Sequence, residues 1–80
     1  MFNTYIIYSK TLDKYYIGST ENIEDRLVRH NRGSSKYTSK AKDWILVYTE
    51  KFDTKSEAIK REYEIKRQKS RKYIEKLLKK

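Results

Sequence analysis

The sequence predicts a small mixed α/β domain of the α+β type, in the order strand, strand, helix, strand, helix, helix. Two segments rich in tyrosine and isoleucine, residues 4–9 (TYIIYS) and 14–19 (KYYIGS), are typical of strands. A continuous apolar run at 44–48 (WILVY) is typical of a buried strand. Apolar residues at helical spacing follow Asn22 and the capping box TKSE at 54–57. Eighty residues leave room for one domain and for no second core.

The first two predicted strands form a hairpin, because only the short polar segment KTLD separates them. Pairing Ser9 with Lys14 places Tyr5 opposite Gly18, so that Tyr5 and Tyr16 share one face of the hairpin. A slip of one residue would put the two tyrosines on opposite faces. The register therefore decides whether the two phenols can act together.

The first helix is predicted to begin after Asn22, whose side chain suits an N-cap, and to end at Gly33. Its buried stripe is predicted at Ile23, Leu27 and His30. Arg26 lies three residues after the start of that stripe and four before its end, so it flanks the stripe. A polar, basic loop is predicted to follow at 33–43.

The helix that begins after the capping box carries an acid, Glu62, within its apolar stripe. The apolar positions of that stripe are predicted to be Ala58, Ile59, Tyr63 and Ile65. Ser70 is the predicted N-cap of a last helix. The inward-facing residues of this last helix are predicted to be Ile74, Leu77 and Leu78.

The charge of the chain indicates a polyanionic partner. Twenty Lys and Arg residues against eleven Asp and Glu give a net charge of +9. Residues 26–42 hold six basic residues and no acid, and residues 60–80 hold ten basic residues and three acids. Two such segments on a small domain favour nucleic acid as the partner. The plain alternative is a charged surface that only keeps the protein soluble.

The composition also excludes several classes of protein. There is no cysteine, which excludes disulfides and thiolate metal sites and suits a reducing compartment. No apolar run is long enough to span a membrane, and the first ten residues lack the pattern of a signal peptide. We therefore expect an intracellular, cytoplasmic protein with no membrane partner.

Five residues fit the needs of phosphodiester hydrolysis, which requires an oxygen ligand for a divalent metal, a cation for the phosphate and a group that activates water. They are Tyr5, Tyr16, Arg26, His30 and Glu62. Each has a structural alternative. The tyrosines could pack on the sheet, Arg26 could extend into solvent, His30 could be an ordinary helix-end histidine, and Glu62 could pair with Lys66 one turn away.

The spacing of these residues resembles the GIY-YIG nuclease superfamily. The sequence Tyr16-Ile17-Gly18 lies eleven residues after Tyr5, and Arg26 follows ten residues after Tyr16. Further matching segments are RHNRG (29–33), KYT (36–38), WILVY (44–48) and KREYEIK (60–66). The chain is most similar to the small stand-alone members and to the structure-selective nucleases of DNA repair. It departs from the pattern at Asn3 and Thr4, where Gly-Ile is usual, and at Ser19, where some members have lysine.

The resemblance implies three antiparallel strands packed with helices, and it implies a role for each residue that matches. Tyr5 and Tyr16 would position or deprotonate the attacking water, and Arg26 would contact the scissile phosphate. His30 would hydrogen-bond a tyrosine or shuttle its proton. Glu62 would be the single protein ligand of one Mg²⁺ or Mn²⁺ ion. Gly18 and Tyr37 would line the site.

The expected function is therefore a metal-dependent endonuclease acting on DNA, and the resemblance implies the structure-selective kind used in repair or recombination. The residues expected to bind the DNA backbone are Arg29, Arg32, Lys36, Lys40, Lys42, Lys66 and Lys69. Two alternatives stay open: a non-catalytic basic binding module on the same scaffold, and a nuclease subunit that needs a protein partner to choose its substrate. Glu62 distinguishes a nuclease from the non-catalytic binding module, because an inward acid weakens phosphate binding and so is of no use to a protein that only binds.

Overall fold

The computed structural model describes residues 1–33 and 38–79 of the chain. Its elements are β1 (Phe2–Ser9), β2 (Lys14–Thr20), α1 (Ile23–Asn31), a short 3-10 helix η1 (Thr38–Lys40), β3 (Ile45–Phe52), α2 (Lys55–Gln68) and α3 (Arg71–Leu78). The predicted α+β class and the predicted order of strands and helices are confirmed. The helix η1 is an addition, inside the segment predicted to be a loop.

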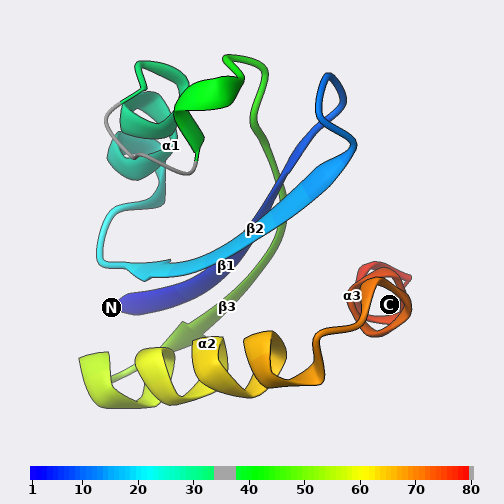
Figure 1. Cartoon of the computed structure of the whole chain (residues 1–80). Coiled ribbons are helices and arrows are strands. Elements are labelled where there is room, and N and C mark those ends of the chain that lie inside the picture. The colour runs from blue at the N-terminus through cyan, green and yellow to red at the C-terminus, as the bar shows by residue number, and fades with distance from the viewer. Residues whose placement is uncertain (34–37, 80) are drawn as a thin grey trace.

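The three strands form one antiparallel sheet in the order β2-β1-β3, so β1 is central and β2 and β3 are its two edges. The helices lie on both sides of this sheet (Figure 1). In that view α1 and η1 lie above the strands, and α2 and α3 lie below them. Each face of the sheet therefore has its own apolar core.

The hairpin has the predicted register. Ser9 pairs with Lys14 and Tyr5 pairs with Gly18. Because side chains alternate along a strand, Tyr5 and Tyr16 lie on the same face, and both belong to the cluster beneath α1. This result confirms that the two tyrosines share one face of the sheet.

The two cores divide the apolar residues by this alternation. On the α1 side, the buried residues are Tyr5, Ile7, Ala41 and Trp44, with Leu12, Tyr16, Ile23 and Leu27 packed against them. On the α2 and α3 side, the buried residues are Ile6, Ile65, Ile74 and Leu77. Neighbouring residues of β1 thus serve opposite cores, which fixes the orientation of every side chain on the central strand.

All three long helices begin at the predicted N-caps. The side chain of Asn22 accepts a hydrogen bond from the backbone N–H of Asp25 at 3.0 Å. Thr54 and Ser70 accept equivalent bonds, at 3.3 Å and 3.2 Å, from the third residue of their own helices. Gly33 has a φ of +81°, a left-handed conformation that suits the residue after a helix end.

Two predictions about burial are wrong. The start of the WILVY segment is not a buried strand, because Ile45 and Leu46 are 56% and 39% exposed at one edge of the sheet, and only Trp44 before them is fully buried. Tyr63 does not face inward either, and it is 59% exposed. It lies five positions after the buried Ala58, about 140° around the helix, which is outside a narrow buried stripe.

Across the described ranges, every helix is too short and too polar to cross a membrane.

Candidate active site

The site is built around Gly18, on the edge strand β2. A Cβ atom added to Gly18 would lie 2.5 Å from the hydroxyl oxygen of Tyr5 and 2.7 Å from its Cζ. The phenol ring of Tyr5 therefore crosses directly over the backbone of Gly18. Only glycine leaves room for this, so the glycine of the predicted motif allows the hydroxyl of a buried β1 residue to reach the β2 edge.

A chain of hydrogen bonds runs from this hydroxyl into the protein. The Tyr5 hydroxyl shares a hydrogen bond of 2.8 Å with His30 Nε2, and His30 Nδ1 shares another of 2.8 Å with Thr38 Oγ1. His30 and Thr38 are both buried, at 2% and 0% exposure. His30 is thus no ordinary helix-end histidine, because its ring is enclosed and both of its nitrogens are engaged.

The surroundings of His30 favour the neutral form of its imidazole. Burial lowers the pKa of His30, and the nearby charge of Arg26 lowers it further. A neutral imidazole has one donor nitrogen and one acceptor nitrogen. Such a ring can pass a proton along the chain from Tyr5 to Thr38 without carrying a charge at rest.

Tyr16 lies on the other side of His30. The centroids of the Tyr16 and His30 rings are 5.0 Å apart at an interplanar angle of 61°, which is an edge contact. The Tyr5 and His30 centroids are 6.0 Å apart. The predicted grouping of both tyrosines with the histidine is therefore present in the structure.

Several groups around the Tyr5 hydroxyl act on its pKa. Burial raises this pKa most, followed by Tyr16, and the Glu62 carboxylate raises it too. Arg26 opposes these effects through its charge and through a hydrogen bond to the phenol. Arg26 is half-buried and lies close enough to Tyr5 to act on its phenol, rather than extending fully into solvent. All these groups are close enough to act on one hydroxyl.

Glu62 reaches the same edge of the sheet from the opposite face. Its Oε1 accepts a hydrogen bond of 2.7 Å from the hydroxyl of Ser19, and its Oε2 lies 2.6 Å from Lys66 Nζ. The Glu62 side chain is 15% exposed. Glu62 is thus directed inward as predicted, and the ion pair with Lys66 that was its alternative explanation is also formed.

Two residues of the site were missed by the sequence analysis. Ser19 follows Gly18 directly, so alternation directs its side chain to the α2 face, where it holds Glu62. Thr38 belongs to the KYT segment, of which only Tyr37 was predicted to matter. The sequence shows a short polar side chain at each of these positions. Its role becomes clear only when the residue that it contacts in the folded protein is known.

The side chains present fit a hard divalent cation such as Mg²⁺. Glu62 offers a carboxylate and Ser19 a hydroxyl, and Mg²⁺ commonly binds through one carboxylate with water and substrate phosphates completing its shell. Within residues 1–33 and 38–79, no group of three His, Cys, Asp or Glu side chains is placed to hold a metal without such help. A cavity of about 270 Å³ adjoins Ser19 and Arg26, so there is space beside both groups.

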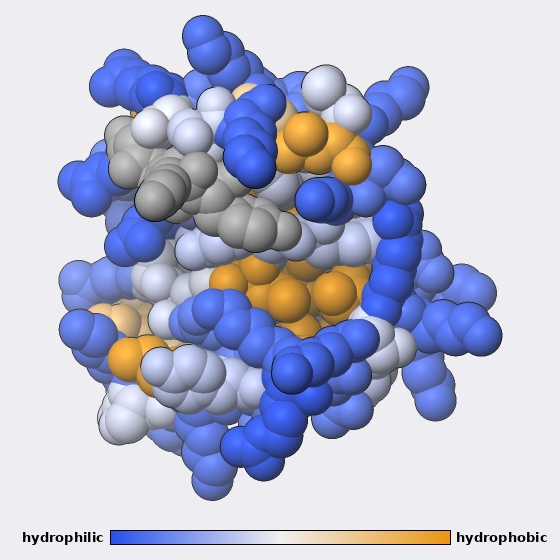
Figure 2. Space-filling view, in the orientation of Figure 1, coloured by the Kyte–Doolittle hydropathy of each residue, from blue (hydrophilic) through white to orange (hydrophobic). Residues whose placement is uncertain are grey.

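The residues predicted to bind the DNA backbone are spread over three elements and the loop. Arg29 is exposed and pairs with Asp25 at 3.2 Å. Lys36 and Tyr37 lie outside the described residues. The remaining residues of this set are exposed: Arg32, Lys40, Lys42, Lys66 and Lys69. The face of the molecule drawn in Figure 2 is largely hydrophilic, with an apolar area near its middle.

The GIY-YIG catalytic domain profile matches residues 1–75. The chain belongs to the GIY-YIG family. The GIY-YIG domain is a nuclease domain, which supports an endonuclease. The predicted family is thereby confirmed.

Three GIY-YIG relatives show how far the similarity extends. A UPF0213 protein of Staphylococcus haemolyticus is 47% identical over 75 residues, which cover 89% of this chain and 90% of that protein. A UPF0213 protein of Staphylococcus saprophyticus is 54% identical over 63 residues, covering 74% and 77% of the two chains. The solution structure of a UPF0213 protein from Bacillus halodurans has a TM-score of 0.61 and 34% identity, and the match covers 99% of this chain and 84% of that one. None of the three names states a reaction, so the similarity to them assigns no substrate.

Proposed function

We propose that this protein is a divalent-metal-dependent endonuclease that hydrolyses phosphodiester bonds of DNA. One observation carries the proposal. Two tyrosines, a half-buried arginine, a neutral buried histidine and an inward carboxylate meet around Gly18, although they come from four different elements. Together these groups supply the oxygen ligand, the cation and the water-activating groups that phosphodiester hydrolysis requires, whereas packing alone needs none of the buried polar ones.

Arg26 is the group that contacts the scissile phosphate. It stands beside the Tyr5 hydroxyl and next to the cavity that adjoins Ser19. A guanidinium in this place stabilises the negative charge that grows on the phosphate oxygens as water attacks. Its effect therefore falls mainly on the rate of cleavage rather than on the affinity for DNA.

The tyrosines and His30 manage the proton of the attacking water. The raised pKa of Tyr5 keeps its hydroxyl protonated at neutral pH, so Tyr5 alone is a poor base. Its hydrogen bond with neutral His30 offers a route: the water gives a proton to the Tyr5 oxygen while the Tyr5 proton passes to Nε2. Tyr16 packs against the same imidazole and helps to hold the water.

Glu62 holds the divalent ion, with Ser19 fixing the carboxylate. When bound there, Mg²⁺ or Mn²⁺ supplies Lewis-acid stabilisation of the phosphate and of the leaving oxygen. The exposed basic residues supply sequence-independent contacts to the DNA backbone. Three finer points belong to the proposal. They are a preference for flapped or branched DNA, as in the repair nucleases that the sequence resembles, an intracellular site of action, and a protein partner that helps to choose the substrate.

The test is a cleavage panel of single-stranded, duplex, flap and branched DNA, with Mg²⁺, Mn²⁺ or a chelator. We expect metal-dependent cleavage that Glu62→Gln reduces by orders of magnitude, because Lewis-acid stabilisation is worth several kcal/mol. Glu64→Gln is the matched control, since it removes an exposed acid two residues away on the same helix. DNA binding measured at matched salt should persist in both variants.

Two results would contradict the proposal. If Glu62→Gln cleaves DNA at the rate of the unaltered protein, Glu62 is not the metal ligand. DNA binding without cleavage by the unaltered protein, across the whole panel, would favour the non-catalytic binding module instead.

A further inference from the structure

Lys66 occupies the Glu62 carboxylate in a way that bears on metal binding. Its ammonium lies 2.6 Å from Glu62 Oε2, while the Ser19 hydroxyl takes Oε1 at 2.7 Å. Both carboxylate oxygens are thus engaged, one of them by a full positive charge. The same ammonium lies 6.0 Å from the centre of the Tyr16 ring, so it is near both the proposed metal ligand and a tyrosine of the site.

An ammonium at this point and a divalent cation on the same carboxylate compete with each other. The pair of Glu62 and Lys66 is neutral, and Arg26 adds a positive charge to the surroundings. A divalent ion that arrived while Lys66 stayed in place would enter a cationic neighbourhood with its only anionic protein ligand already neutralised. Binding of the ion is therefore favoured when Lys66 leaves the carboxylate.

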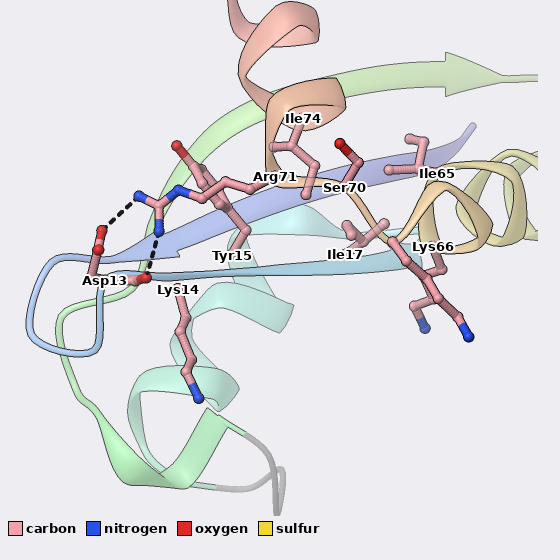
Figure 3. A pocket seen from close by; sticks show the side chains of 10 residues that line it. Asp13, Lys14, Tyr15, Ile17, Ile65, Lys66, Ser70, Arg71 and Ile74 are labelled. Atoms are coloured by element: carbon pink, nitrogen blue, oxygen red, sulfur yellow. Dashed lines mark hydrogen bonds and ion pairs between the residues drawn. The ribbon is translucent and has the colours of Figure 1, made fainter.

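Lys66 has room to leave. Its side chain is 43% exposed, whereas that of Glu62 is only 15% exposed. Lys66 also lies on the rim of a hollow of about 260 Å³ between β2 and the junction of α2 and α3. Figure 3 shows its side chain pointing away from the floor of that hollow, which Ile17, Ile65 and Ile74 form. A change of rotamer is enough to separate the pair, without moving the backbone.

We propose that Lys66 is a displaceable occupant of the metal position on Glu62. In the free protein it neutralises the carboxylate, and when a divalent ion binds it is released and becomes available to a phosphate of the DNA. This inference rests on the proposed function. The release of Lys66 couples metal binding to DNA binding, because DNA supplies the negative charge that holds both the released ammonium and the incoming ion. Metal binding is consequently weak without DNA and stronger with it.

The experiment measures Mn²⁺ affinity in the absence of DNA, from the paramagnetic broadening of backbone amide NMR signals. The variants are Lys66→Met, which keeps the length of the side chain and removes its charge, and Lys60→Met, which removes an exposed charge from another side of the same helix. We expect Lys66→Met to bind Mn²⁺ about three- to tenfold more tightly, and Lys60→Met to change affinity less than about twofold. An equal or weaker affinity in Lys66→Met than in Lys60→Met would overturn the inference.

A second measurement separates this inference from the proposed function. Broadening should centre on Ser19 and Glu62, and Glu62→Gln should abolish it there. Broadening that never centres on these residues would overturn the metal site and the role of Lys66 together. Broadening centred there, with unchanged affinity in Lys66→Met, would overturn the role of Lys66 and leave the metal site intact.

If Lys66 only stabilised its helix, its removal would not change how strongly DNA binding and metal binding affect each other. In the unaltered protein, saturating DNA should strengthen Mn²⁺ binding by a larger factor than in Lys66→Met, because the variant has no ammonium left to release. An equal factor in both proteins would also overturn the inference.

Discussion

Gly18→Ala tests the contact on which the whole site depends. The added Cβ would lie 2.5 Å from the Tyr5 hydroxyl oxygen and 2.7 Å from Cζ, distances that real Cβ atoms do not tolerate. Tyr5 is 2% exposed and packs in the core beneath α1, so its ring cannot move aside without disturbing that core. Overpacking of this kind costs about 1–3 kcal/mol of the free energy of unfolding.

The displaced ring would also lose its hydrogen bond with His30. A buried His30 left without this hydrogen bond adds about 1–3 kcal/mol to the loss in the free energy of unfolding, unless the ring settles where the bond survives. For a domain of this size, 1 kcal/mol shifts the melting temperature by about 4–8 °C, so even the smaller cost is measurable. We expect a lower melting temperature together with a cleavage rate reduced by more than about tenfold at a temperature where the variant stays folded.

The assay combines thermal unfolding with cleavage of the best substrate from the panel. Tyr5→Leu, alone and combined with Gly18→Ala, supplies the control, because leucine is shorter and removes the atoms that the new Cβ would meet. The double variant should be more stable than the sum of the two single effects predicts, since the clash is then absent. A Gly18→Ala protein with unaltered stability and cleavage would refute the described approach of Tyr5 to the β2 backbone.

Four further predictions follow from the same site. Thr38→Val keeps the shape of the side chain but leaves His30 Nδ1 without its partner at 2.8 Å, so chemical denaturation should show a loss of about 1–3 kcal/mol, with slower cleavage; unchanged stability would mean that water replaces the hydroxyl. Arg26→Ala should reduce the cleavage rate far more than the affinity for DNA, and equal losses would make Arg26 only a phosphate anchor. His30 is the single histidine, and its pKa is lowered in the folded state, so the unfolded chain binds a proton more readily as the pH falls. The free energy of unfolding should therefore decrease below about pH 6.5, by at most about 1.4 kcal/mol per pH unit. His30→Gln should lose this pH dependence. With about 4–6 phosphate contacts, the affinity for DNA should fall with a log–log salt slope of about −3 to −5, and an affinity that ignores salt would exclude a backbone-dominated interface.

The sequence by itself determined the local structure of this protein. The odd separation of Tyr5 and Tyr16 and the short polar turn set the hairpin register, because side chains alternate strictly along a strand. Asn22, Thr54 and Ser70 set the helix starts, because each cap satisfies an N–H group three residues away. These features need only neighbours in the chain, so they can be recognised without knowing the fold.

Burial and the second layer of the site were decided by the tertiary structure. The WILVY run has an exposed start because β3 became an edge of the sheet, and no local pattern states which strands will be edges. The same holds for the partners of the predicted catalytic residues. Thr38 closes the hydrogen-bond chain from eight residues away in the sequence, and Ser19 meets Glu62 from 43 residues away. Such contacts exist only once two elements pack together. A short hydroxyl side chain can donate or accept a hydrogen bond in many settings, so its role is known only when its partner is known.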